Sequence, residues 1–223
     1  MPSKNFMEKI QKDINASMRA MLIDWLVEVA EEYRLLPDTL FLTVNYIDRY
    51  LSGKAMNRQR KYEEICAPKA EEFCYVTDNT YSKEQVLEME SSVLNFLKFE
   101  MTAPTTRCFL RRFIIVADKT CEVPLMQLEY LADYIAELSL LEYDMLEYTP
   151  SLVAASATLL AKYILLPRKK PWNSMLRHYT GYQAPELREC VKGLHLLYCN
   201  GYQNLPSITA IKEKYSQHKW LEL

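Results

Sequence analysis

Hydrophobic residues recur along this chain at the three- and four-residue spacing that is typical of α-helices. In residues 18–34 they are so frequent that only a narrow acidic face remains. Such a helix either lies deep in a bundle or lends part of its surface to a partner. Ile23, Val27 and Ala30 widen an apolar stripe that consists of Met18, Met21, Leu22, Trp25, Leu26, Val29 and Tyr33.

Start and stop signals divide the rest of the first half into further helices. Pro37 and Gly53 bound one helix, and a capping box from Ser82 to Gln85 opens another. In the second of these, Glu90 falls on the predicted apolar stripe. We expect it to meet a cation or to lie at an interface, because a carboxylate buried without a partner is costly. The other members of that stripe are Val86, Met89, Val93 and Leu97.

The second half repeats the organisation of the first. Pro150 opens a helix rich in Ala and Ser, over residues 151–164, and small residues let neighbouring helices approach closely. We therefore expect it to be the central helix of its bundle. The first half has no such helix before Lys61 and is shorter by roughly fifteen residues, about one average helix plus a turn. The polar stretch NRQRKYEEI, residues 57–65, marks the junction.

Composition excludes several classes of function. Four glycines in 223 residues favour an all-helical fold and form no phosphate-binding loop. The three histidines are isolated, and the six cysteines form no C-x-x-C pair, so we predict reduced thiols, no metal, no cofactor and no enzyme activity. A net charge of −2 argues against nucleic-acid binding, and no apolar run is long enough for a membrane span.

Several motifs together resemble the A-type cyclins, most closely those of plants. They are MRAMLIDWLVEV, VNYIDRYLS, KYEEI and YSKEQVLEME in the first half, and PTTRCFLRRF and YTPSLVAASATLLAKY in the second. The resemblance implies two tandem cyclin-box bundles of the five-helix type, the first lacking its central helix. The expected divisions are an N-terminal helix segment (1–16), a shortened first box (17–101), a second box (102–203) and a C-terminal helix (204–223).

The resemblance also implies residue roles. Lys61 and Glu90 match residues that hold a cyclin-dependent kinase near its regulatory helix, and Glu64 and Ile65 stand beside Lys61 in the same motif. Arg19 and Asp48 match a structural ion pair that ties the first helix to the second. A docking patch for R-x-L segments of substrates and inhibitors is implied at Met18, Met21, Leu22, Trp25 and Glu28.

The resemblance predicts a nuclear (and cytoplasmic) regulatory subunit that activates a cyclin-dependent kinase and controls cell-cycle progression. The missing helix leaves a second reading, a non-activating isoform or a truncated gene product. A cyclin-fold transcription factor is a third reading, disfavoured by the absence of a basic face and of paired cysteines.

Overall fold

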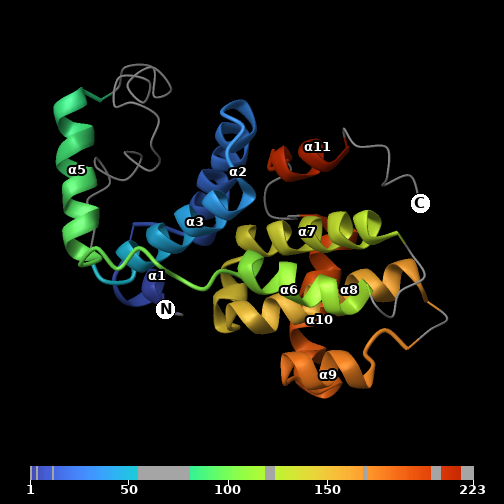
Figure 1. Cartoon of the computed structure of the whole chain (residues 1–223). Helices are drawn as coiled ribbons and strands as arrows, with labels where there is room; N and C mark the ends of the chain where they lie inside the picture. The colour runs from blue at the N-terminus through green and yellow to red at the C-terminus, as the bar shows by residue number, and fades with distance from the viewer. Residues whose placement is uncertain are drawn as a thin grey trace. The chain divides into compact units, whose positions relative to one another are not determined.

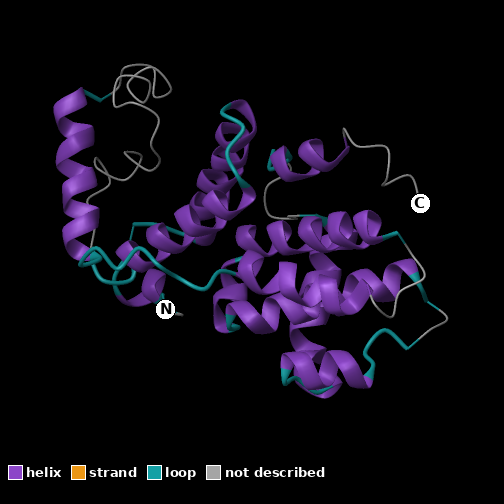
Figure 2. Ribbon diagram, viewed as in Figure 1, coloured by secondary structure: helices purple, strands orange, loops and turns teal. Residues whose placement is uncertain are grey.

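The structure is a computed structural model that describes residues 2–3, 5–11, 13–54, 81–118, 124–167, 170–201 and 207–216. All regular secondary structure in these ranges is helical (Figures 1 and 2), which confirms the predicted class. The elements are α1 (Phe6–Lys9), α2 (Ala16–Glu32), α3 (Pro37–Leu51), α5 (Lys83–Phe96), α6 (Thr106–Asp118), α7 (Leu125–Leu141), the 3-10 helix η2 (Tyr143–Glu147), α8 (Pro150–Leu165), α9 (Ser174–Thr180), α10 (Ala184–Asn200) and α11 (Ala210–Ser216).

The chain forms two compact units. The first contains Met1–Asn15 and Leu42–Ala103, and the second contains Ala16–Phe41 and Pro104–Leu223. Helix α2 therefore belongs to the same unit as the second half of the chain, although it opens the predicted first box.

The first unit is built around the contact between α3 and α5. The Tyr50 hydroxyl lies 3.1 Å from Ser92 Oγ and 3.5 Å from Met89 Sδ, and its ring meets Phe96 edge-on at 5.2 Å. Behind α3, the buried Gln11 amide donates to the carbonyls of Leu51 and Lys54. Those carbonyls lie at and just beyond the C-terminal end of α3, where no intrahelical N–H remains to bond them. The Gln11 side chain therefore caps this end of the helix.

The second unit is a bundle around α8, which packs against α6, α7 and α10 (Figure 1). Thr149 caps its start by accepting the Leu152 N–H, and Pro150 occupies the first turn, where no donor is needed. The small residues of α8 let the neighbouring backbones approach closely, and five of them have no exposed surface: Ala154, Ala155, Ser156, Ala157 and Ala161. This complete burial confirms α8 as the central helix of the second unit.

Candidate docking and kinase-binding sites

Helix α2 presents the predicted docking patch as a half-exposed stripe. Met21 is 41% exposed and Glu28 is also exposed, whereas Met18, Leu22 and Trp25 are half-buried. The opposite side of the helix is fully packed, with Ala20, Ile23 and Val27 almost completely buried. The stripe is thus surface and not core, and its chemistry is apolar with a carboxylate at one end.

The second unit holds α2 in place through two polar contacts. Arg19 Nη1 donates to the Leu140 carbonyl at 2.7 Å, at the end of α7. The Asp24 carboxylate accepts the Ala210 N–H at 2.9 Å, where α11 begins. Burial raises the pKa of Asp24, although backbone hydrogen bonds from Ala210 and Thr209 oppose the shift.

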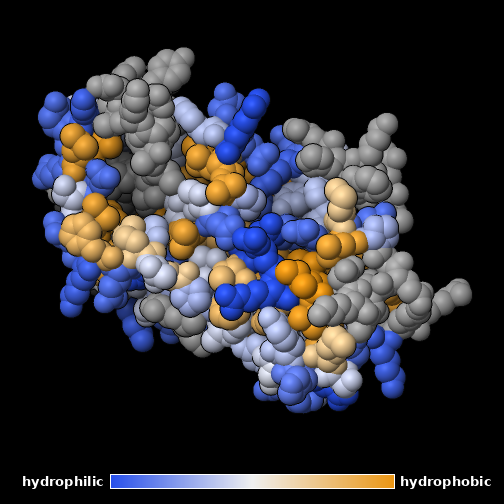
Figure 3. Space-filling model, viewed as in Figure 1, coloured by the Kyte–Doolittle hydropathy of each residue, from blue (hydrophilic) through white to orange (hydrophobic). Residues whose placement is uncertain are grey.

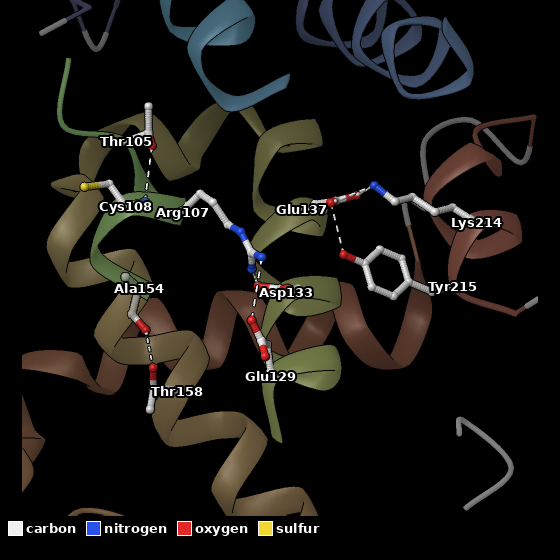
Figure 4. A network of polar contacts seen from close by, with 10 residues as sticks. All are labelled: Thr105, Arg107, Cys108, Glu129, Asp133, Glu137, Ala154, Thr158, Lys214 and Tyr215. Atoms are coloured by element: carbon white, nitrogen blue, oxygen red, sulfur yellow. Dashed lines mark hydrogen bonds and ion pairs between the residues drawn. The ribbon is translucent and has the colours of Figure 1, made fainter. Parts of the chain in front are cut away.

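Both members of the predicted structural ion pair, Arg19 and Asp48, are buried. Arg19 is 3% exposed and Asp48 is 2% exposed. The two residues fall in different compact units, and their ion pair stays a prediction. A comparable pair occurs within the second unit, where Arg107 of α6 meets Asp133 of α7, with Glu129 3.8 Å away (Figure 4).

Glu90, the described part of the predicted kinase-binding site, lies on the exposed surface of α5. The stripe that it shares by spacing is therefore not buried at this position, and its expected contact with a cation or an interface stays a prediction. The helix packs through Met89, and its buried side turns toward Ser92 and Phe96, so Glu90 points about a quarter-turn away. It forms no hydrogen bond or ion pair with other described residues and is available to a partner. The predicted residues Lys61, Glu64 and Ile65 lie outside the described residues.

Helix α5 buries few of its own side chains. Within the helix Met89 is the one buried residue, while Leu87 is 44% and Phe96 37% exposed. Hydrophobic surface is visible over this helix in Figure 3. Exposed apolar surface on a helix is a feature of interaction sites and of incompletely covered cores alike.

A buried polar cluster in the second unit was not predicted from the sequence. Glu137 of α7 is 1% exposed and accepts hydrogen bonds from Lys214 Nζ at 2.9 and 3.1 Å and from the Tyr215 hydroxyl at 3.0 Å (Figure 4). Burial raises the pKa of Glu137, and Lys214 opposes that shift. The carboxylate of Glu137 within the apolar segment YIAELSLL, residues 134–141, was the signal that could have revealed it.

Two further properties of the described residues bear on function. Across the described ranges, no three His, Cys, Asp or Glu side chains gather where they could hold a metal ion. In the same ranges no helix combines the length and the apolar character that crossing a membrane requires.

Comparison with known families agrees with these features. Residues 1–102 match the family "Cyclin, N-terminal domain", and residues 104–223 match "Cyclin, C-terminal domain". The chain belongs to the cyclin family. It is 65% identical to Cyclin-A1-3 of Oryza sativa subsp. japonica and 62% identical to Cyclin-A1-1 of Arabidopsis thaliana, each over 98% of this chain. Within the family, this cyclin is therefore of the plant A type.

The matches also show how much of those proteins this chain covers. It spans 47% of the length of the rice protein and 50% of the Arabidopsis protein. The rice alignment has 233 positions, whereas 98% of 223 residues is about 219, so about 14 positions have no counterpart here. That is close to the length of the helix predicted to be missing.

Solved structures support the fold. A viral cyclin from herpesvirus saimiri superposes with a TM-score of 0.71 at 18% identity, over 87% of this chain and 90% of the viral one. A chain in the structure of the CAK complex from Chaetomium thermophilum bound to ATP-gamma-S gives 0.61 at 15% identity, over 94% and 76%. The predicted pair of cyclin boxes is confirmed.

Proposed function

We propose that this cyclin binds and activates a cyclin-dependent kinase and performs no chemistry itself. The observation that carries the proposal is its high identity to plant A1-type cyclins across both domains. A protein kinase is active only when the glutamate of its regulatory helix pairs with the phosphate-binding lysine. A rigid partner surface can hold that helix in place, and Glu90, exposed on α5, is available for such a contact.

The stripe on α2 supports a second role, the recruitment of R-x-L segments of substrates and inhibitors. Met21, Leu22 and Trp25 offer a half-exposed apolar surface for the leucine. Glu28, exposed one turn further along the helix, offers a carboxylate for the arginine.

Two substitutions in the full chain separate these roles. Trp25→Ala should raise the Kd of a fluorescein-labelled R-x-L peptide by about thirtyfold, the value for a tryptophan hot spot of about 2 kcal/mol. Kinase affinity, measured by calorimetry, should stay the same. Glu90→Ala should weaken kinase binding and spare the peptide. If Trp25→Ala weakened both equally, the stripe would be part of the core.

A non-activating isoform is the second candidate. It is favoured by the 14 or so missing positions and by the sparse burial of α5. The test is to insert a cyclin central helix between Arg60 and Lys61 and to titrate both chains against the kinase. Binding by the restored chain alone would establish this candidate, whereas equal binding by both, weakened in each by Glu90→Ala, would exclude it.

A nuclear (and cytoplasmic) location is part of the proposal, since a role in cell-cycle control requires access to nuclear substrates. A fluorescent fusion of the chain that stays out of the nucleus would contradict it. A transcription-factor role has no support in the comparisons, which return plant A-type cyclins.

A further inference from the structure

Helix α11 is a seven-residue element whose position depends on its neighbours. A helix this short has little stability alone in water. Ala210, Ile211 and Tyr215 are buried, and the helix packs against both α2 and α7. The Tyr130 hydroxyl of α7 also donates to the Tyr215 carbonyl at 2.6 Å.

The contacts of α11 with α2 fall on a single face of α2. Asp24, which accepts the Ala210 N–H, and Glu31, 3.3 Å from Lys214 Nζ, are seven residues apart and so lie in line along the helix. Met21 and Glu28 of the docking stripe are three and four residues from Asp24. They therefore lie next to that face, and the contacts with α11 determine which way the stripe turns.

Lys214 joins three elements. Its ammonium group bonds both oxygens of the buried Glu137 on α7 and also pairs with the half-exposed Glu31 in the last turn of α2 (Figure 4 shows the side chains of Lys214 and Tyr215 directed at Glu137). Without it the two carboxylates would repel each other, since Glu31 already acts to raise the pKa of Glu137. The end of α2 would then be pushed away from α7.

We propose that Lys214 is a positioning residue for substrate docking, since it fixes the orientation of α2 through Glu31 and Glu137. The inference rests on the docking function proposed above. It assigns to the C-terminal helix a role in the affinity of a surface that it does not form.

The test uses the full chain, a fluorescein-labelled R-x-L peptide and the kinase. Lys214→Met should raise the peptide Kd about five- to tenfold, within the range of typical coupling between sites. Lys214→Arg, which keeps the charge, should restore the affinity. Lys212→Met is the matched control: it makes the same charge change on the same helix, and Lys212 is exposed, with no side-chain bond among the described residues.

Glu31→Gln tests the link to α2 separately, in case Lys214→Met does not fold. The ion pair of Glu31 with Lys214, which is exposed on the Glu31 side, should contribute about two- to threefold in peptide affinity. Glu32→Gln, on the neighbouring exposed glutamate, corrects for the change in net charge and should show no further loss. Kinase affinity should stay the same in all five variants.

The outcomes are distinct. Peptide affinity lost in Lys214→Met and Glu31→Gln, with kinase affinity retained and the arginine rescue successful, supports the inference. It is overturned if these two variants match their controls, or if peptide and kinase affinities fall by the same factor. Should Trp25→Ala leave peptide binding intact, the docking function itself fails, whatever Lys214 does.

Discussion

Replacing Gly53 with alanine tests the contact on which the first unit depends. A Cβ at this position would overlap Cζ of Phe96, at a distance that real Cβ atoms essentially never show. Gly53 is not among the residues with a positive φ, so alanine suits its backbone, and the clash with the ring is the whole effect. The Phe96 ring, which meets Tyr50 edge-on at 5.2 Å, has to move outward.

The magnitude follows from the burial of Phe96. The residue is 37% exposed, so about three-fifths of it is covered. At about 25 cal/mol per Å2, and with about 150–250 Å2 for a fully buried aromatic, the covered part contributes roughly 2–4 kcal/mol. Since a displaced ring keeps part of this, we expect Gly53→Ala to cost about 1–3 kcal/mol.

A double-mutant cycle with Phe96→Ala makes the reasoning testable. Without the ring, the three atoms nearest to a Cβ at position 53 are gone. Alanine there should become neutral or stabilising by about 0.4–1 kcal/mol, because it restricts the unfolded chain. Urea unfolding gives the free energies, and hydrogen exchange of the α3 and α5 amides reports on the first unit by itself. An equal cost of Gly53→Ala in both backgrounds would refute the proposed clash.

Two further predictions concern ionisable groups in the second unit. Burial raises the pKa of Asp24 above its ordinary value of 3.8, so its contribution to stability is complete below that value and is lost as the pH rises through the folded-state pKa. Asp24→Asn, which stays neutral and keeps an oxygen for the Ala210 N–H, should gain stability relative to the original chain over that interval; parallel urea midpoints across the interval would contradict this. Burial also raises the pKa of Cys190 to about 11, so an alkylating reagent near pH 8 should label the exposed Cys108 and Cys199 and leave Cys190 unmodified. Mass spectrometry of the peptides checks this, and rapid labelling of Cys190 in the folded chain would contradict it.

Local sequence was sufficient for the helical class and for several helix boundaries. The capping box at Ser82 and Gln85 forms as predicted, and Pro150 opens α8, because these signals act within one turn of the helix that they start. The central place of α8 could also be predicted, because a run of Ala and Ser lets neighbouring helices pack closely against it. The apolar stripe of α2 also followed from its spacing, whereas its use as a docking patch was implied by the family resemblance and stays a prediction.

The tertiary structure decided which side of each helix is covered. Glu90 shares a stripe with Val86 and Val93 by spacing alone, yet α5 meets Tyr50 through Met89 and Phe96, and the carboxylate stays exposed. Likewise, nothing local in α2 indicates that Asp24 meets α11, 186 residues away along the chain. Helical periodicity fixes which residues share a face, whereas the choice of buried face depends on the side chains of a distant partner.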